Sequence, residues 1–79
     1  MKLTFDPRYN IAYIQLREKN ETVTSIKISE ELVIDMAADG SVYGIELLNA
    51  KEQLENKNAL HLQFINAATG EEKGFDIAA

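Results

Sequence analysis

The stretch 31–50, ELVIDMAADGSVYGIELLNA, constrains the fold of this chain more than any other part of the sequence. Asp39-Gly40 separates two alternating apolar segments, and this dipeptide is typical of a type I′ hairpin turn, which needs positive φ at both central residues. Pairing Ala38 with Ser41 places six apolar residues on one face, because side chains alternate with period two. The facing pairs are Met36 with Tyr43, Ile34 with Ile45, and Leu32 with Leu47. A slip of one residue would break this face, so the sequence predicts a hairpin in this register.

Alternating segments before this hairpin predict further strands around 3–5, 11–17 and 22–28. Asp6-Pro7 ends the first strand, because proline fixes φ and the Asp side chain can cap a turn. Consecutive antiparallel strands with short connections favour a meander. We therefore expect an α+β, mainly β fold, in which an antiparallel meander sheet contains the central Asp-Gly hairpin.

One short helix and a β-rich C-terminal segment complete the expected fold. Asn49-Ala50-Lys51-Glu52 has the form of a capping box, so a helix should run from about Ala50 to about Asn56. Further on, the alternation of Leu60, Leu62 and Phe64 favours a strand, with a turn over 69–74 and a return strand at 75–77. The same segment, 59–67, also fits helical spacing, and this alternative stays open.

Size and composition describe one ordinary globular domain, 1–79. Hydrophobic residues make up 46% of the chain and charged residues 27%, which is typical of folded soluble proteins. A sheet this small rarely covers both its faces, so we expect a homo-oligomer. The chain lacks an apolar run of about 20 residues, a signal-peptide pattern and cysteine, which favours the cytoplasm and no membrane association.

The charge balance bears on the kind of partner. Thirteen acidic residues against eight basic ones give a net charge of −5. Binding to a phosphate backbone relies on clustered Lys and Arg, so we expect no direct contact with nucleic acid. A basic protein partner fits better, because complementary potentials speed encounter.

Few side chains are candidates for a functional site. Asp35 and Glu46 lie on the polar side of the central hairpin, within reach of each other, as a contact for a partner, a weak cation site or a carboxylate pair. A metal site needs more oxygen ligands than the sequence places here, so we predict no metal and no cofactor. Tyr9, in the turn after Asp6-Pro7, is a candidate interface anchor. The single histidine, His61, lies on the polar side of its strand and is expected to face solvent.

The chain contains no GxGxxG, Walker-type loop, HExxH, CxxC or GxSxG motif, and we predict no catalytic residues and no enzymatic activity.

Residues 1–54 resemble domain-of-unknown-function family 2283, a family of small prokaryotic proteins. The resemblance is carried by Phe5-Asp6-Pro7, by AYIQL at 12–16, by VIDM at 33–36 and by DGSVYGIELLNA at 39–50, of which GIELLNA is the most specific. Tyr9 and Asn10 depart from the small and acidic residues common in the family, and Ala37-Ala38 from a more polar approach to the turn.

The resemblance implies a compact β-rich domain with no assigned catalytic residues. Some family members are similar to the small partner encoded beside a ribonuclease-like toxin, which implies an antitoxin role. We therefore expect a protein-interaction module, of which an antitoxin-like partner is the most concrete form, with Tyr9, Asp35 and Glu46 as interface candidates. The alternative is a small protein that binds a ligand or a divalent cation through the face of Asp35 and Glu46.

Overall fold

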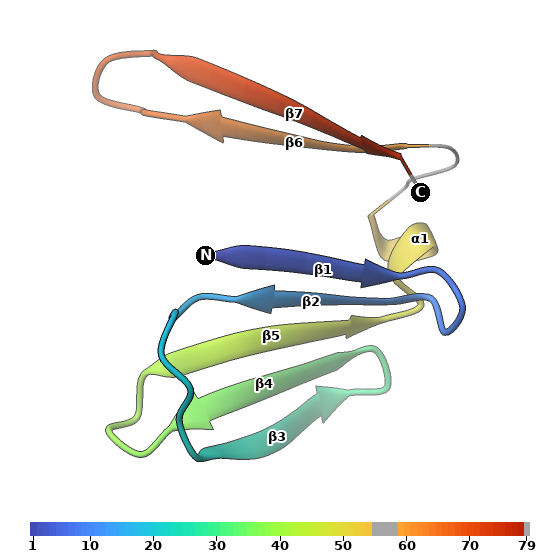
Figure 1. Ribbon diagram of the computed structural model, residues 1–79, viewed down its shortest axis with the longest axis vertical. Coiled ribbons are helices and arrows are strands. Elements are labelled where there is room, and N and C mark those ends of the chain that lie inside the picture. Colours follow the sequence, from blue (N-terminus) through green and yellow to red (C-terminus); the bar gives the residue numbers. More distant parts are fainter. Residues whose placement is uncertain (55–58, 79) are drawn as a thin grey trace.

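The computed structural model of the chain describes residues 1–54 and 59–78 (Figure 1). Five strands form one antiparallel sheet, and two more form a separate hairpin, with one short helix between them. The fold class is the expected one, mainly β with a single helix. The elements are β1 (Lys2–Asp6), β2 (Ile11–Gln15), β3 (Val23–Ser29), β4 (Leu32–Ala37), β5 (Val42–Leu48), α1 (Ala50–Gln53), β6 (Ala59–Ile65) and β7 (Glu72–Ala78).

The strand order departs from the expected meander. It is β1-β2-β5-β4-β3, so β5 lies between β2 and β4, and the connection 16–22 carries the chain past the end of the sheet to its far edge (Figure 1). The sheet consists of the β1–β2 hairpin and a β3–β4–β5 meander, joined where β2 pairs with β5. Alternation in the sequence fixes which face a residue takes but not which strand lies beside it, and this is why the order was missed.

The central hairpin has the predicted register over most of its length. Leu32 pairs with Leu47 and Ile34 with Ile45. After Asp35 a bulge shifts the register, so that Met36 pairs with Val42 and Tyr43 is the extra residue. Tyr43 is almost fully buried, and its carbonyl accepts a hydrogen bond from the amide of Leu16.

The turn of this hairpin is not of type I′. Gly40 has a φ of +87°, but Asp39 is not among the residues with positive φ. The amide of Gly40 donates to the carbonyl of Ala37 at 3.0 Å, and the amide of Ala37 donates to the carbonyl of Ser41 at 2.8 Å. This is a three-residue loop that ends in one left-handed glycine, which is the next most common hairpin connection. It consumes one more residue than a type I′ turn, and the bulge in β5 compensates for the difference.

One face of the five-stranded sheet is apolar from edge to edge. The register places one aliphatic residue of every strand in a single row, and a second row beside it is apolar in four strands. We call these nine residues the apolar face: Leu3, Ile14, Ile45, Ile34 and Ile26 in the first row, and Phe5, Ala12, Leu47 and Leu32 in the second. Only Ala12 is buried; Ile26 is 39% exposed and the others are half-buried.

The helix α1 is shorter than predicted and is capped by a different residue. Asn49 is left-handed, with a φ of 54°, and its side chain makes no capping bond. Instead, Asn10 caps the helix: its side-chain oxygen accepts from the amide of Lys51 at 2.8 Å, and its side-chain nitrogen donates to Glu52 at 2.8 Å. The expected capping box of Asn49 and Glu52 is therefore wrong, because the turn before β2 supplies the cap from outside the helix.

The helix ends at Gln53, and the predicted end at Asn56 lies outside the described residues. No helix in residues 1–54 and 59–78 is long and apolar enough to cross a membrane.

The C-terminal segment forms strands, which decides the alternative left open for 59–67. β6 and β7 pair with each other through a turn that contains Gly70, at a φ of +77°. Neither strand joins the five-stranded sheet, and the hairpin stands apart from it beyond β1 and α1 (Figure 1).

Gly40→Val should destabilise the protein by about 1–3 kcal/mol, because a β-branched side chain is strained at a φ of +87°. Chemical denaturation measures the change in the free energy of unfolding. Ala38→Val is the matched control: it lies in the same loop, is exposed, and does not have positive φ, so its cost should be much smaller. Equal stabilities of Gly40→Val and the parent would contradict this turn.

Candidate interaction surface

The face of the sheet opposite the apolar face is mostly polar. Its two central rows cross all five strands in register. One row contains Lys2, Gln15, Gly44, Asp35 and Ser25, and the other Thr4, Tyr13, Glu46, Val33 and Lys27. We call these ten residues the polar face. The two lysines lie on the edge strands, whereas both carboxylates lie near the centre.

Hydrogen bonds connect the polar face across four strands. The phenol of Tyr13 on β2 donates to Oδ2 of Asp35 on β4 at 2.7 Å, and the hydroxyl of Ser25 on β3 donates to Oδ1 at 2.6 Å. To reach Asp35, the ring of Tyr13 passes over Gly44 of β5. A Cβ atom on Gly44 would lie 2.1 Å from the phenol oxygen, so this glycine is what allows the crossing.

The environment keeps the phenol of Tyr13 protonated. Burial raises the pKa of Tyr13 above its ordinary value, and the hydrogen bond to the carboxylate of Asp35 and the nearby charge of Glu46 raise it further. At neutral pH Tyr13 is therefore a hydrogen-bond donor to Asp35 and not a base. The arrangement fixes a side chain in place; it does not activate a nucleophile.

Asp35 and Glu46 lie diagonally across β4 and β5, as the predicted register requires. Among the described residues neither carboxylate forms an ion pair, and Asp35 accepts hydrogen bonds from two hydroxyl groups. The same part of the chain contains no group of three or more His, Cys, Asp or Glu residues that could hold a metal ion. The pair is thus a small region of negative charge in the middle of the sheet.

Tyr9 lies away from this pair, in the turn between β1 and β2. It is 70% exposed, and the guanidinium of Arg8 lies 5.6 Å from the centre of its ring. The carboxylate of Asp6 accepts hydrogen bonds from the backbone and side chain of Arg8, which is ordinary turn chemistry. The three interface candidates therefore do not form one site: two lie inside strands, and Tyr9 lies beyond the end of the sheet.

His61 is exposed, as predicted, but it has a partner on the neighbouring strand. Its Nδ1 lies 2.6 Å from Oδ1 of Asp76, directly across the β6–β7 hairpin. The pair lies on the surface and links the two strands of the hairpin.

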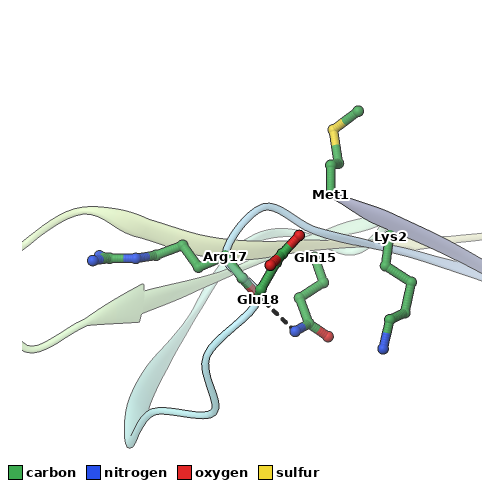
Figure 2. A pocket seen from close by; sticks show the side chains of 5 residues that line it. All are labelled: Met1, Lys2, Gln15, Arg17 and Glu18. Carbon is green, nitrogen blue, oxygen red and sulfur yellow. Dashed lines mark hydrogen bonds between the residues drawn. The ribbon is translucent and has the colours of Figure 1, made fainter.

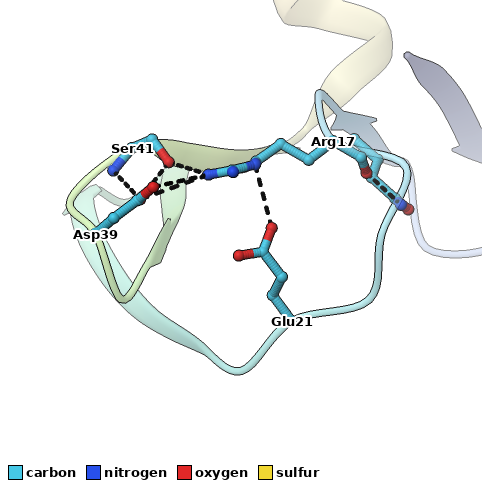
Figure 3. Close-up of polar contacts among 5 residues, drawn as sticks. Arg17, Glu21, Asp39 and Ser41 are labelled. Carbon is cyan, nitrogen blue, oxygen red and sulfur yellow. Dashed lines mark hydrogen bonds and ion pairs between the residues drawn. The ribbon is translucent and has the colours of Figure 1, made fainter.

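Arg17 organises the opposite end of the sheet from Tyr9 and was not expected from the sequence. Its guanidinium contacts Glu21 at 3.1 Å, Asp39 at 3.5 Å and the hydroxyl of Ser41, so it ties the β2–β3 connection to the central turn (Figure 3). Hydrogen bonds from Ser41, together with the charge of Arg17, lower the pKa of Asp39 to about 2. The cluster depends on the strand order and so could not be inferred from spacing.

A hollow of about 280 Å³ lies at the free end of β1 and β2, lined by Met1, Lys2, Gln15, Arg17 and Glu18. The five side chains do not converge on one point, and the amide of Gln15 already donates to the carbonyl of Arg17 at 2.7 Å (Figure 2). Sites for small molecules combine an enclosed apolar lining with convergent polar groups, and this hollow has neither.

The fold and the polar face together define a small antiparallel sheet domain. The comparison with protein families matches residues 2–51 to a family described as "Protein of unknown function (DUF2283)", and the chain belongs to this family. The match spans the whole five-stranded sheet and ends inside α1, so the β6–β7 hairpin lies outside it. Comparisons with curated proteins and with solved structures found no match.

Gly44→Ala should destabilise the protein by roughly 1–2 kcal/mol, because the added methyl group displaces Tyr13 from Asp35. In a Tyr13→Ala background the clash is absent, and the same substitution should be neutral or stabilising, since alanine is less costly than glycine in a strand. Urea unfolding of the two single variants and the double variant measures this reversal of sign. A Gly44→Ala cost that is the same in both backgrounds would contradict the crossing.

Proposed function

We propose that this protein is a protein-interaction module and that the centre of its polar face binds a basic protein partner. The carboxylates of Asp35 and Glu46 carry this proposal. They lie diagonally across β4 and β5 in the middle of the sheet, and in the described residues no cation of the chain pairs with either.

The chemistry of the pair suits Arg or Lys of a partner. Each oxygen of Asp35 already accepts one hydroxyl, which orients the carboxylate and leaves further lone pairs to accept from a cation. Glu46 adds a second negative charge beside it, and the chain as a whole has a net charge of −5. Such complementarity raises the rate of encounter and selects against acidic partners.

The most specific form of the proposal is an antitoxin-like partner of a small basic ribonuclease-like toxin in the cytoplasm. Proteins that bind RNA tend to be basic, and the negative centre of the polar face is a suitable surface to contact one. In this role the module acts by binding and not by catalysis. Tyr9, exposed at the end of the sheet, is a second and separate candidate anchor.

The test uses the full-length tagged chain to capture proteins from a lysate of its source organism, followed by binding measurements with the purified companion. We expect a small basic protein in about equimolar amount, bound more weakly at high salt. Glu46→Lys should reduce its affinity by about tenfold or more, because it places like charges opposite each other. Asp35 is less suitable for charge reversal, since the loss of its carboxylate would also break the hydrogen bonds from Tyr13 and Ser25.

Glu71→Lys is the matched control, because it makes the same change in net charge in the exposed turn of the second hairpin. It should bind the companion as tightly as the parent does. Equal weakening by both variants, or a companion without basic character, would contradict the assignment of the polar face.

A further inference from the structure

Two apolar surfaces of this chain lie open to solvent. The first is the apolar face of the sheet, of which eight of the nine residues are only half-buried or exposed. The second is one side of the β6–β7 hairpin, which we call the arm. Leu62 pairs with Phe75 there, and Phe64 lies on the same side; these residues are 41%, 55% and 63% exposed. A lone two-stranded hairpin is marginally stable in water, so the arm needs a surface to pack against.

The chain exposes more surface than a compact protein of its mass does, and the excess is close to the area that one partner buries in an interface. The chain exposes 5964 Å², whereas a compact protein of 8.9 kDa exposes about 4,800 Å². Its radius of gyration, 14.0 Å, likewise exceeds the roughly 12 Å of a compact chain of this length. The excess of about 1,100 Å² is comparable to the roughly 800 Å² that one partner buries in a stable complex.

We propose that the arm of one copy covers the apolar face of a second copy, and that the second copy reciprocates. Such an exchange is symmetric, so one pair of surfaces closes the assembly as a dimer. It would bury about 2,200 Å² over the two copies, which is within the range of permanent dimers. The proposal does not depend on the basic partner, because it uses the opposite face of the sheet.

Charge favours a second copy as the occupant. The apolar face contains no charged residue, so docking brings none of the chain's excess negative charge into contact there. On the arm, Lys73 pairs with Phe64 and therefore lies on the docking side itself. Its long side chain can keep the ammonium group at the rim of the interface, where it meets a chain with a net charge of −5.

Light scattering of the full-length chain should give twice the mass of one chain. Phe64→Asp should raise the dissociation constant of the dimer by about tenfold or more, because it removes an aromatic ring that becomes buried when the dimer forms. The new carboxylate faces Lys73, so the arm itself should keep its pairing. Ile65→Lys is the control: Ile65 is 53% exposed on the other side of the arm and faces Glu72, and this variant should remain a dimer.

Cross-linking decides which copy the arm covers, and the absence of native cysteine makes it simple. Chains with Phe64→Cys and chains with Ile26→Cys are mixed and treated with a short bis-maleimide. Exchange predicts a cross-linked pair of unlike chains, and at least a tenfold lower yield when Ile65→Cys replaces Phe64→Cys.

Three outcomes would overturn the proposal. They are a monomer at all concentrations, a dimer that Phe64→Asp leaves intact, and a mixture of the two cysteine variants that does not cross-link although a double variant with both cysteines cross-links within one chain. A monomer that still binds a basic companion through Glu46 would refute the exchange and leave the proposed function standing. A dimer that captures no basic companion would leave the exchange standing and refute the proposed function.

Discussion

The pairing of β5 on both sides is the interaction on which the rest of the structure depends. β5 joins the β1–β2 hairpin to the β3–β4 hairpin, so its alternation sets the two faces of the whole sheet. Ile45 and Leu47 point to one side and Gly44 and Glu46 to the other. Because partners across a ladder share a face, five strands inherit this division. The result is a sheet that is aliphatic on one side and polar on the other.

The hydrogen bonds of the polar face depend on the absence of a side chain at Gly44 in β5. Without a Cβ atom, the strand lets Tyr13 pass over it to Asp35, and Ser25 completes the connection. These hydrogen bonds hold a carboxylate in the centre of a sheet without a cation. A site fixed by its own sheet loses little freedom on binding, which is an advantage for an interface. The strand β5 therefore sets the two faces of the sheet and also allows the hydrogen bonds that hold the carboxylate of the proposed contact.

Much of the fold follows from local patterns in the sequence. Alternation located the strands and the register of Ile34 with Ile45, and the family motif located the domain. Details that depend on the path of the chain were missed. The strand order was one, the cap that Asn10 provides for a helix forty residues later was another, and the turn geometry at Gly40 was a third. The strand order and the cap are settled by tertiary contacts that no short window contains. The turn lies within residues 37–41, and a dipeptide ending in glycine suits a three-residue loop as well as a type I′ turn.

The candidate site shows the same limit. The adjacency of Asp35 and Glu46 followed from the hairpin register. The role of Tyr13 did not, because it belongs to a strand whose neighbour the sequence leaves open, although a glycine facing Asp35 was a signal of close approach. The cluster around Arg17 was missed for the same reason.

The apolar face, in contrast, is left largely open to solvent by the rest of the chain. A chain of 79 residues buries a modest share of its surface, and here no large side chain of the described residues is fully buried. The family match ends inside α1, so the arm lies outside it and brings its own apolar side. Two surfaces that each lack a partner, on one chain, are the simplest basis for self-association.

The most direct measurement is an isotope-filtered nuclear Overhauser experiment on a mixture of labelled and unlabelled full-length chains. Contacts between the ring protons of Phe64 or Phe75 in one chain and the methyl groups of Ile14, Ile34 or Ile45 in the other are the predicted result. Contacts found only within single chains, or none from the arm to these methyl groups, would contradict the account.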